Sequence, residues 1–274
     1  MQLTLNPTTK LMVERVKAEL PHALILHGTE GVGLRTLALD IAGHSLARII
    51  EPTNTDGAID TEKGSVRVDK IRELYDATKT KHPKRAVYII DNADTMSPAA
   101  QNAFLKLLEE PNPHVHFILT AHDKSKFLPT VVSRAQSLHV QKVAQQDSLK
   151  VLTSLGVNDD KKRQQLLFMA LGRPALLTRL ASDNKAFNGM VQTVTDARII
   201  LQGTAADKMV VLSNYWADRH KSIQLLESAM AIIALSMNSK PTDDIIELGD
   251  RLATAYDRIS MNGNVKLHLL SSMV

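Results

Sequence analysis

A short apolar run that stops at a glycine-rich turn and resumes as a helical pattern constrains this chain more than any other feature. The run covers residues 22–27, the turn covers 28–33, and apolar residues recur at helical spacing over 37–50. A continuous apolar run of this length, closed by glycine, predicts a buried strand, and the resumed period predicts a helix after the loop. Strand, loop and helix in this order indicate the start of an α/β domain.

Further apolar runs alternate with helical patterns along the first half of the chain. Residues 86–91 and 115–120 read as buried strands, whereas 8–20, 68–79 and 98–110 carry helical periods. Buried strands that alternate with helices of this length predict a parallel sheet with helices on both faces.

The turn has the glycine spacing of a P-loop but lacks the residues that follow it. Gly28, Gly31 and Gly33 supply the backbone that can hold phosphate oxygens, whereas the positions for Lys and Ser/Thr are Leu34 and Arg35. Arg35 stands one position late on the helix, and is therefore turned about 100° away, so we expect its guanidinium to stay out of the loop. These glycines are candidate phosphate-binding residues of a degenerate site. The loop taken alone favours an ordinary glycine-rich strand-to-helix turn, because short glycine patterns often match by chance.

A second nucleotide motif is also incomplete. The strand at 86–91 delivers Asp91 at its carboxyl end, where ligands bind in open parallel sheets. In an active ATPase of this type the Asp holds Mg²⁺ and a following Glu polarises water, but that position is Asn92, whose amide is no base at neutral pH. The two losses together predict weak nucleotide binding or none.

The length and amino-acid composition further restrict the fold class and the kinds of site that the chain can contain. The 274 residues exceed one typical domain, and aromatic residues make up only 4%, which favours helices over a β-sandwich. The chain has no cysteine and its ten histidines show no ligand-like spacing, so we expect no metal site.

No apolar run spans a membrane and the first residues do not resemble a signal peptide, so we expect a cytoplasmic protein. The net charge of +4 is only a mild bias towards nucleic acid.

Beyond residue 143 only helical periods remain, interrupted by turn signals at Gly156, Gly172-Arg-Pro174 and Lys240-Pro241. We therefore expect an α/β domain at 1–142, a small helical domain at 143–182 and a C-terminal helical domain at 183–274.

The most specific motif begins at Asp91. It contains Asn102-Ala-Phe-Leu-Lys-Leu-Leu-Glu-Glu-Pro111, and Ser133-Arg134 follows the next apolar run. In order and spacing these residues resemble the clamp-loader family of AAA+ proteins, with its N-A-L-L-K-x-L-E-E-P helix and its S-R-C motif, and weaker similarity continues to 261–267. The resemblance implies a P-loop AAA+ domain with a parallel sheet, followed by an all-α lid and an all-α collar through which subunits join.

Within that family the eroded loop looks like that of the bacterial delta-prime subunits, the non-hydrolysing stators of the DNA polymerase III clamp loader. The resemblance implies that Arg134 is an arginine finger that acts on ATP-Mg bound by a neighbouring subunit, because a guanidinium suits the charge of a transferring phosphoryl group. It also implies gamma/tau and delta subunits as partners, with the sliding clamp and primer-template DNA reached through the complex. Two departures are Ala135 in place of the motif's Cys and the absence of the four-cysteine zinc module near 51–66.

Other interpretations remain open at this point. The chain could be an active gamma/tau-like ATPase that uses Gly28–Gly33 and Asp91, or an unrelated DNA-binding or adaptor module that shares only the fold. Arg173 is either a phosphate contact or a plain helix-start arginine. The candidate DNA contacts are lysines and an arginine that also fit a solvated turn and helix: Lys79, Lys81, Lys84, Arg85 and Lys106.

Overall fold

The computed structural model describes residues 3–43, 46–61, 63–78, 85–110, 112–237 and 242–273. The chain divides into two compact units, an α/β unit at residues 1–181 and a helical unit at 182–274. The three-domain division, with its further boundary at residue 142, stays a prediction.

The α/β unit alternates helices and strands and then ends in helices. Its elements are α1 (Pro7–Ala18), β1 (Ala23–His27), α2 (Leu34–Ala42), β2 (Leu46–Ile50), α3 (Val68–Thr78), β3 (Ala86–Ile90), η1 (Ala93–Thr95), α4 (Pro98–Glu109), β4 (Val115–Ala121), η2 (Lys124–Lys126), α5 (Pro129–Val132), β5 (Gln136–His139), α6 (Gln145–Ser154), α7 (Asp160–Ala170) and α8 (Pro174–Ser182). The five strands of the described residues form one parallel sheet in the order β2-β3-β4-β1-β5. This confirms the predicted α/β fold with a parallel sheet.

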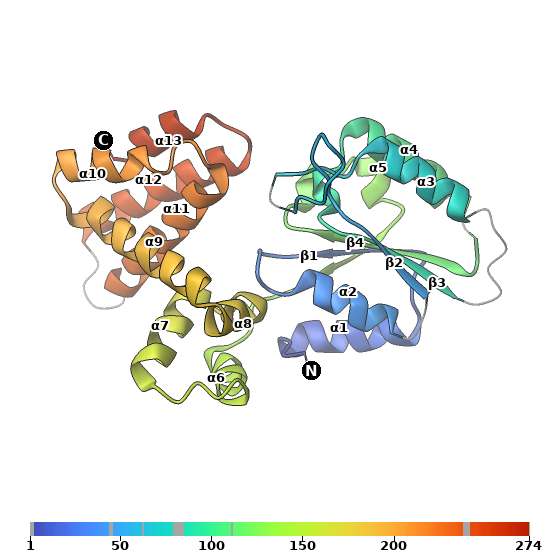
Figure 1. Ribbon diagram of the computed structural model, residues 1–274, viewed down its shortest axis with the longest axis horizontal. Coiled ribbons are helices and arrows are strands. Elements are labelled where there is room, and N and C mark those ends of the chain that lie inside the picture. The colour runs from blue at the N-terminus through green and yellow to red at the C-terminus, as the bar shows by residue number, and fades with distance from the viewer. Residues whose placement is uncertain are drawn as a thin grey trace. The chain divides into compact units, whose positions relative to one another are not determined.

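Both faces of the sheet are buried, because α1 and α2 cover one face and α3 and α4 cover the other (Figure 1). All five residues of β3 are buried. Tyr88 and Ile90 belong to the core beneath α3 and α4, whereas Val87 and Ile89 belong to the core beneath α1 and α2. Successive side chains of a strand point to opposite faces, so a central strand with two helical layers must be apolar throughout.

The sequence interpretation of residues 37–50 as one helix is wrong. The helix α2 ends at Ala42, Gly43 adopts a positive φ of 60°, and Leu46–Ile50 is strand β2. Glycine closes the helix because it adopts this left-handed backbone without strain, and a short apolar run fits a strand as well as a helix. The strand β5 was also not predicted, since only Leu138 of its four residues is buried.

The helical unit contains α9 (Asn184–Gln202), α10 (Ala205–Ser213), α11 (Arg219–Met237), α12 (Asp243–Ser260) and α13 (Val265–Ser271). Its core is built mainly from Leu, Ile and Ala of these helices. Tyr215 and Asp196 form a buried polar pair in this unit. The Tyr215 hydroxyl donates to the Asp196 carboxylate at 2.6 Å, and burial raises the pKa of Tyr215. The turn predicted at 240–241 lies outside the described residues.

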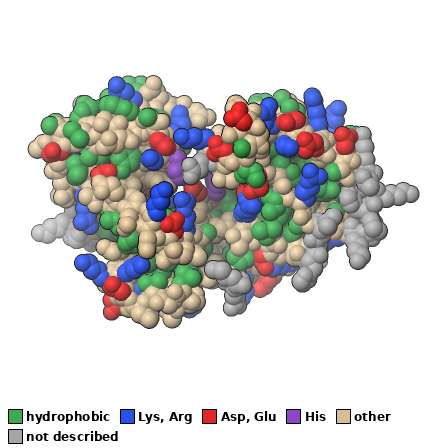
Figure 2. Space-filling model, in the orientation of Figure 1, with side chains coloured by type: hydrophobic (Ala, Val, Ile, Leu, Met, Phe, Trp, Pro, Cys, Tyr) green, Lys and Arg blue, Asp and Glu red, His purple; other side chains and the backbone are tan. Residues whose placement is uncertain are grey.

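On the face drawn in Figure 2, Lys and Arg side chains are interspersed with Asp and Glu and with hydrophobic side chains. No helix of the described residues is long and apolar enough to cross a membrane.

Candidate functional site

The glycine-rich turn joins β1 to α2 at the carboxyl end of the sheet. Gly31 and Gly33 have φ values of 86° and 96°, and α2 begins immediately after Gly33. Gly28 continues the strand, because its backbone N–H donates to the carbonyl of Ala121 at 3.2 Å. The turn therefore has two positions that an L side chain would strain, and the role of its glycines in phosphate binding stays a prediction.

The loop is in contact with the first turn of α8. The backbone N–H groups of Ala175 and Leu176 both donate to the carbonyl of Gly31, at 2.9 and 3.0 Å. A Cβ atom at Gly31 would lie 2.8 Å from the Cβ of Leu176. The Gly31 carbonyl thus satisfies two of the N–H groups that a helix start leaves without partners, and glycine is required for this close approach.

Asp91 directly follows β3 at the carboxyl end of that strand. It is 5% exposed, and one carboxylate oxygen accepts from the Thr120 hydroxyl at 2.6 Å. The other oxygen accepts from the Arg35 guanidinium at 3.3 Å. Thr120 in turn accepts from the backbone N–H of Asn92 at 2.9 Å. Both oxygens of the carboxylate are therefore bound by groups of this chain.

Arg35 binds a second carboxylate, that of Glu51, in a short ion pair. The hydrogen bond to Glu51, with the charges of Glu51 and Asp91, raises the pKa of Arg35, although partial burial acts in the opposite direction. The side chain of Arg35 is 43% exposed, while those of Glu51 and Asp91 are 20% and 8% exposed. We call this group of three side chains the Arg35 cluster. Its cation contacts the carboxylate that the sequence predicts as a degenerate metal-binding Asp.

The Arg35 cluster was not predicted from the sequence, which gave Arg35 no partner. A signal was available, since Glu51 follows residues 46–50, which are apolar except for Arg48, just as Asp91 follows 86–90. Two parallel strands that each end in a carboxylate place both charges at one edge of the sheet. The signal was missed because β2 was interpreted as part of a helix.

Arg134 lies between α5 and β5 and is 40% exposed. Its guanidinium donates to the Thr130 carbonyl at 3.2 Å and forms an ion pair of 3.2 Å with Glu109 of α4. Arg134 therefore has an accessible cationic group held from two sides. Its role as an arginine finger stays a prediction.

The remaining predicted contacts differ in their surroundings. Arg173 is 7% exposed, and it donates to the carbonyls of Ala170 and Met169 at the end of α7, as expected for a structural arginine. Arg85 donates to the carbonyl of Ile41 at 3.4 Å, and Lys106 is exposed on α4. Lys79, Lys81 and Lys84 lie outside the described residues. In the part of the chain that is described, no group of three or more His, Asp or Glu side chains could hold a metal ion.

A family model and individual relatives both match this chain to subunits of DNA polymerase III. A family model described as DNA polymerase III, delta subunit, matches residues 46–144. DNA polymerase III subunit delta' of Haemophilus influenzae is 30% identical over 113 residues, which are 40% of this chain and 35% of the relative. DNA polymerase III subunit gamma/tau of Mycoplasma genitalium is 29% identical over 177 residues, which are 57% of this chain and 29% of the relative. The chain thus spans about a third of the length of these relatives.

Solved structures show the same fold over almost the whole chain. A DNA polymerase III, gamma subunit-related protein of Thermotoga maritima has a TM-score of 0.56 at 18% identity, with 97% of each chain covered. A single-residue variant of RuvB from Thermotoga maritima has a TM-score of 0.50 at 15% identity, with 99% of this chain and 88% of that chain covered. At these identities the likeness concerns the fold alone.

Proposed function

Because the chain is a member of the DNA polymerase III clamp-loader family, we propose that it is a non-hydrolysing subunit of the loader, of the delta-prime type. The observation that carries this proposal is the Arg35 cluster. In it a guanidinium of the same chain neutralises Asp91, the carboxylate that would hold Mg²⁺. In this proposal the chain binds no cofactor of its own, and ATP-Mg belongs to a neighbouring subunit.

Three features of the loop region support a site without catalysis. A P-loop needs Lys and Ser/Thr after its last glycine, and here these positions are Leu34 and Arg35. Leu34 is 5% exposed and packs in the core beneath α1 and α2, so it offers nothing to a phosphate. A metal ion at Asp91 would meet the positive charge of Arg35 and would have to break the ion pair between Arg35 and Asp91.

Arg134 is proposed to act on a partner's ATP as an arginine finger. The side chain is exposed, and its ion pair with Glu109 lies in solvent, where such pairs contribute little free energy. It can therefore exchange Glu109 for a phosphate at small cost. A guanidinium supplied across an interface stabilises the charge of the transferring phosphoryl group without any nucleotide in its own subunit.

The proposed partners are the gamma/tau and delta subunits, with the sliding clamp and primed DNA contacted through the assembled loader in the cytoplasm. The relatives named as DNA polymerase III subunits support this assignment. The energy for opening and loading the clamp would come from ATP bound by gamma/tau. This chain would contribute a fixed subunit surface and Arg134.

The test is steady-state ATP hydrolysis by gamma/tau assembled with delta, the clamp, primed DNA and this chain. We expect wild type to stimulate turnover, and Arg134→Ala to assemble normally but to lower kcat at least about tenfold, since an arginine finger is worth more than this. Arg72→Ala, which removes an exposed arginine of α3, is the matched control and should behave as wild type. Equal rates of ATP hydrolysis with the wild type and with Arg134→Ala would refute the role of Arg134 as an arginine finger.

A second candidate function is an active gamma/tau-like ATPase, favoured by the match to gamma/tau over 57% of the chain. Nucleotide binding and ATP hydrolysis by the isolated chain distinguish this function from that of a non-hydrolysing subunit. We expect no binding of a fluorescent ATP analogue with Mg²⁺ and no hydrolysis above the background rate. Turnover that disappears in Asp91→Asn would establish the active ATPase and overturn the non-hydrolysing subunit.

A further inference from the structure

The sheet has a free edge at β2. Strand β2 pairs only with β3 among the described residues, and the Asp91 N–H donates to the Ile50 carbonyl at 2.9 Å. Successive residues of a strand direct their backbone groups to opposite sides, so the N–H and C=O of Ile49 face away from β3. Within the described part of the chain, Ile49 has no partner for these outward groups. They are free to pair with an added strand.

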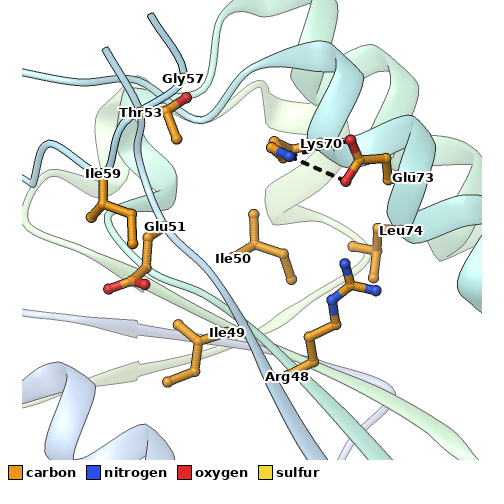
Figure 3. Close-up of a pocket in the computed structure, with 10 residues that line it drawn as sticks. All are labelled: Arg48, Ile49, Ile50, Glu51, Thr53, Gly57, Ile59, Lys70, Glu73 and Leu74. Carbon is orange, nitrogen blue, oxygen red and sulfur yellow. Dashed lines mark hydrogen bonds and ion pairs between the residues drawn. The ribbon is translucent and has the colours of Figure 1, made fainter.

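A cavity of about 220 Å³ opens beside this edge, between β2, the loop at 53–59 and α3 (Figure 3). We call it the β2-edge pocket. Among its lining residues are Arg48, Ile50, Thr53, Ile59 and Leu74. In Figure 3 Ile50 lies centrally, while Ile59 and Leu74 lie on opposite sides of it. The pocket thus combines apolar side chains with the free backbone edge.

The loop that carries Ile59 is ordered. Thr53 forms antiparallel bridges with Ile59 and with Ser65, and the Asp60 N–H donates to the Pro52 carbonyl at 3.0 Å. Even so, Ile59 is 64% exposed. The backbone therefore holds a large, mostly exposed apolar side chain beside the pocket, where it gains little from packing within this unit.

Two polar groups of the pocket also lack partners. Thr53 is 7% exposed, and its hydroxyl has no hydrogen-bond partner in the described residues. Arg48 is exposed, and no ion pair with it is present in the same residues. The other charged side chains are already paired, Lys70 with Glu73 at 3.2 Å and Glu51 with Arg35. Arg48 is the cation that remains for a ligand.

We propose that the β2-edge pocket binds an extended peptide segment with an acidic side chain, which adds to β2 as a further strand. The backbone of the segment pairs with the outward groups of Ile49, its carboxylate binds Arg48, and an apolar side chain packs on the exposed Ile59. A lone charge can also protect a sheet edge from pairing. That role explains Arg48 but not the exposed Ile59.

The test uses the full chain and a fluorescein-labelled peptide of alternating valine and threonine with one central glutamate. We expect saturable binding by fluorescence anisotropy, and Arg48→Glu should weaken it at least about tenfold, the loss expected for one charged hydrogen bond. The matched control is Arg72→Glu on α3, which makes the same charge change outside the pocket and should bind as wild type. The same peptide with a central lysine should prefer Arg48→Glu to wild type.

A second readout separates strand addition from simple charge attraction. A peptide with N-methylated backbone cannot complete a β ladder and should not bind, and hydrogen exchange at the Ile49 amide should slow only with the unmethylated peptide. Amides of β5, the opposite edge strand, should be unaffected. No saturation at about 1 mM, a very weak affinity, would overturn the proposal. Equal binding by Arg48→Glu or by the methylated peptide would also overturn it, as would self-association of the chain that Arg48→Glu abolishes.

Discussion

Two arginines of the α/β unit, Arg35 and Arg134, each contact carboxylates, but their surroundings differ. Arg35 contacts two carboxylates, and one of them, Asp91, has a side chain only 8% exposed. Arg134 contacts one carboxylate, that of Glu109, and the two side chains are 40% and 53% exposed. A buried carboxylate that loses its cation is costly, whereas an exposed pair exchanges partners readily. Arg35 is therefore committed to the structure of its own chain, whereas the Arg134 guanidinium is accessible to another molecule.

The comparison is tested most strongly by Arg35→Ala. This variant leaves Asp91 buried beside Glu51 without a cation, so we expect the free energy of unfolding to fall by about 2 kcal/mol. Urea denaturation followed by circular dichroism measures the change. Adding Asp91→Asn to Arg35→Ala should recover part of the loss, because the unpaired buried charge is removed. Unchanged stability in Arg35→Ala would mean that the Arg35 cluster contributes nothing to the fold.

The next effect concerns the loop that α8 contacts. Gly31→Ala places a Cβ 2.8 Å from the Cβ of Leu176 and also strains a residue with a φ of 86°. We expect a loss of about 1–2 kcal/mol, which combines steric overlap with backbone strain. Gly33→Ala is the matched control, since its φ is 96° but its nearest neighbour would be 3.6 Å away. A smaller loss in Gly33→Ala than in Gly31→Ala would confirm that contact with α8, and not only backbone strain, requires the glycine.

We expect the stability of the α/β unit to depend on pH through His27, which precedes the glycine-rich turn. Burial, together with the charges of His139 and Lys124, lowers the pKa of His27 at the end of β1. The unfolded chain then binds a proton more readily than the folded one, so stability is full above about pH 6.5 and falls as the pH decreases. We expect the melting temperature to drop between pH 7 and pH 5, and less so in His27→Asn. An equal drop in both proteins would exclude His27 as a cause.

The smallest effect is expected at Arg134. Arg134→Ala and Glu109→Gln should each change the free energy of unfolding by less than about 0.5 kcal/mol, because their ion pair is exposed. Urea denaturation under the conditions used for Arg35→Ala gives the direct comparison. A loss in Arg134→Ala as large as that in Arg35→Ala would show that Arg134 is a structural residue, and would remove the contrast between the two arginines.

Much of the fold could be predicted from local patterns. The runs at 22–27, 86–91 and 115–120 are strands because each is apolar on both faces and closed by polar or turn residues. Strand β5 could not be recognised in this way, because it lies at the second edge of the sheet and buries only Leu138. Edge strands carry less of the hydrophobic pattern by which a strand is recognised.

The sequence by itself determined the α/β class, the glycine-rich turn, the position of Asp91 at the carboxyl end of a strand and the absence of the P-loop Lys and Ser/Thr. Only the tertiary structure decided what replaces them. Strand β2 pairs in parallel with β3, and Ile50 lies opposite Ile90. The next residues, Glu51 and Asp91, therefore lie side by side at the carboxyl ends of the two strands. Arg35 reaches both from the first turn of α2. Partners separated by 16 and 56 positions leave no periodic signal, because strand order, and not local sequence, brings them together.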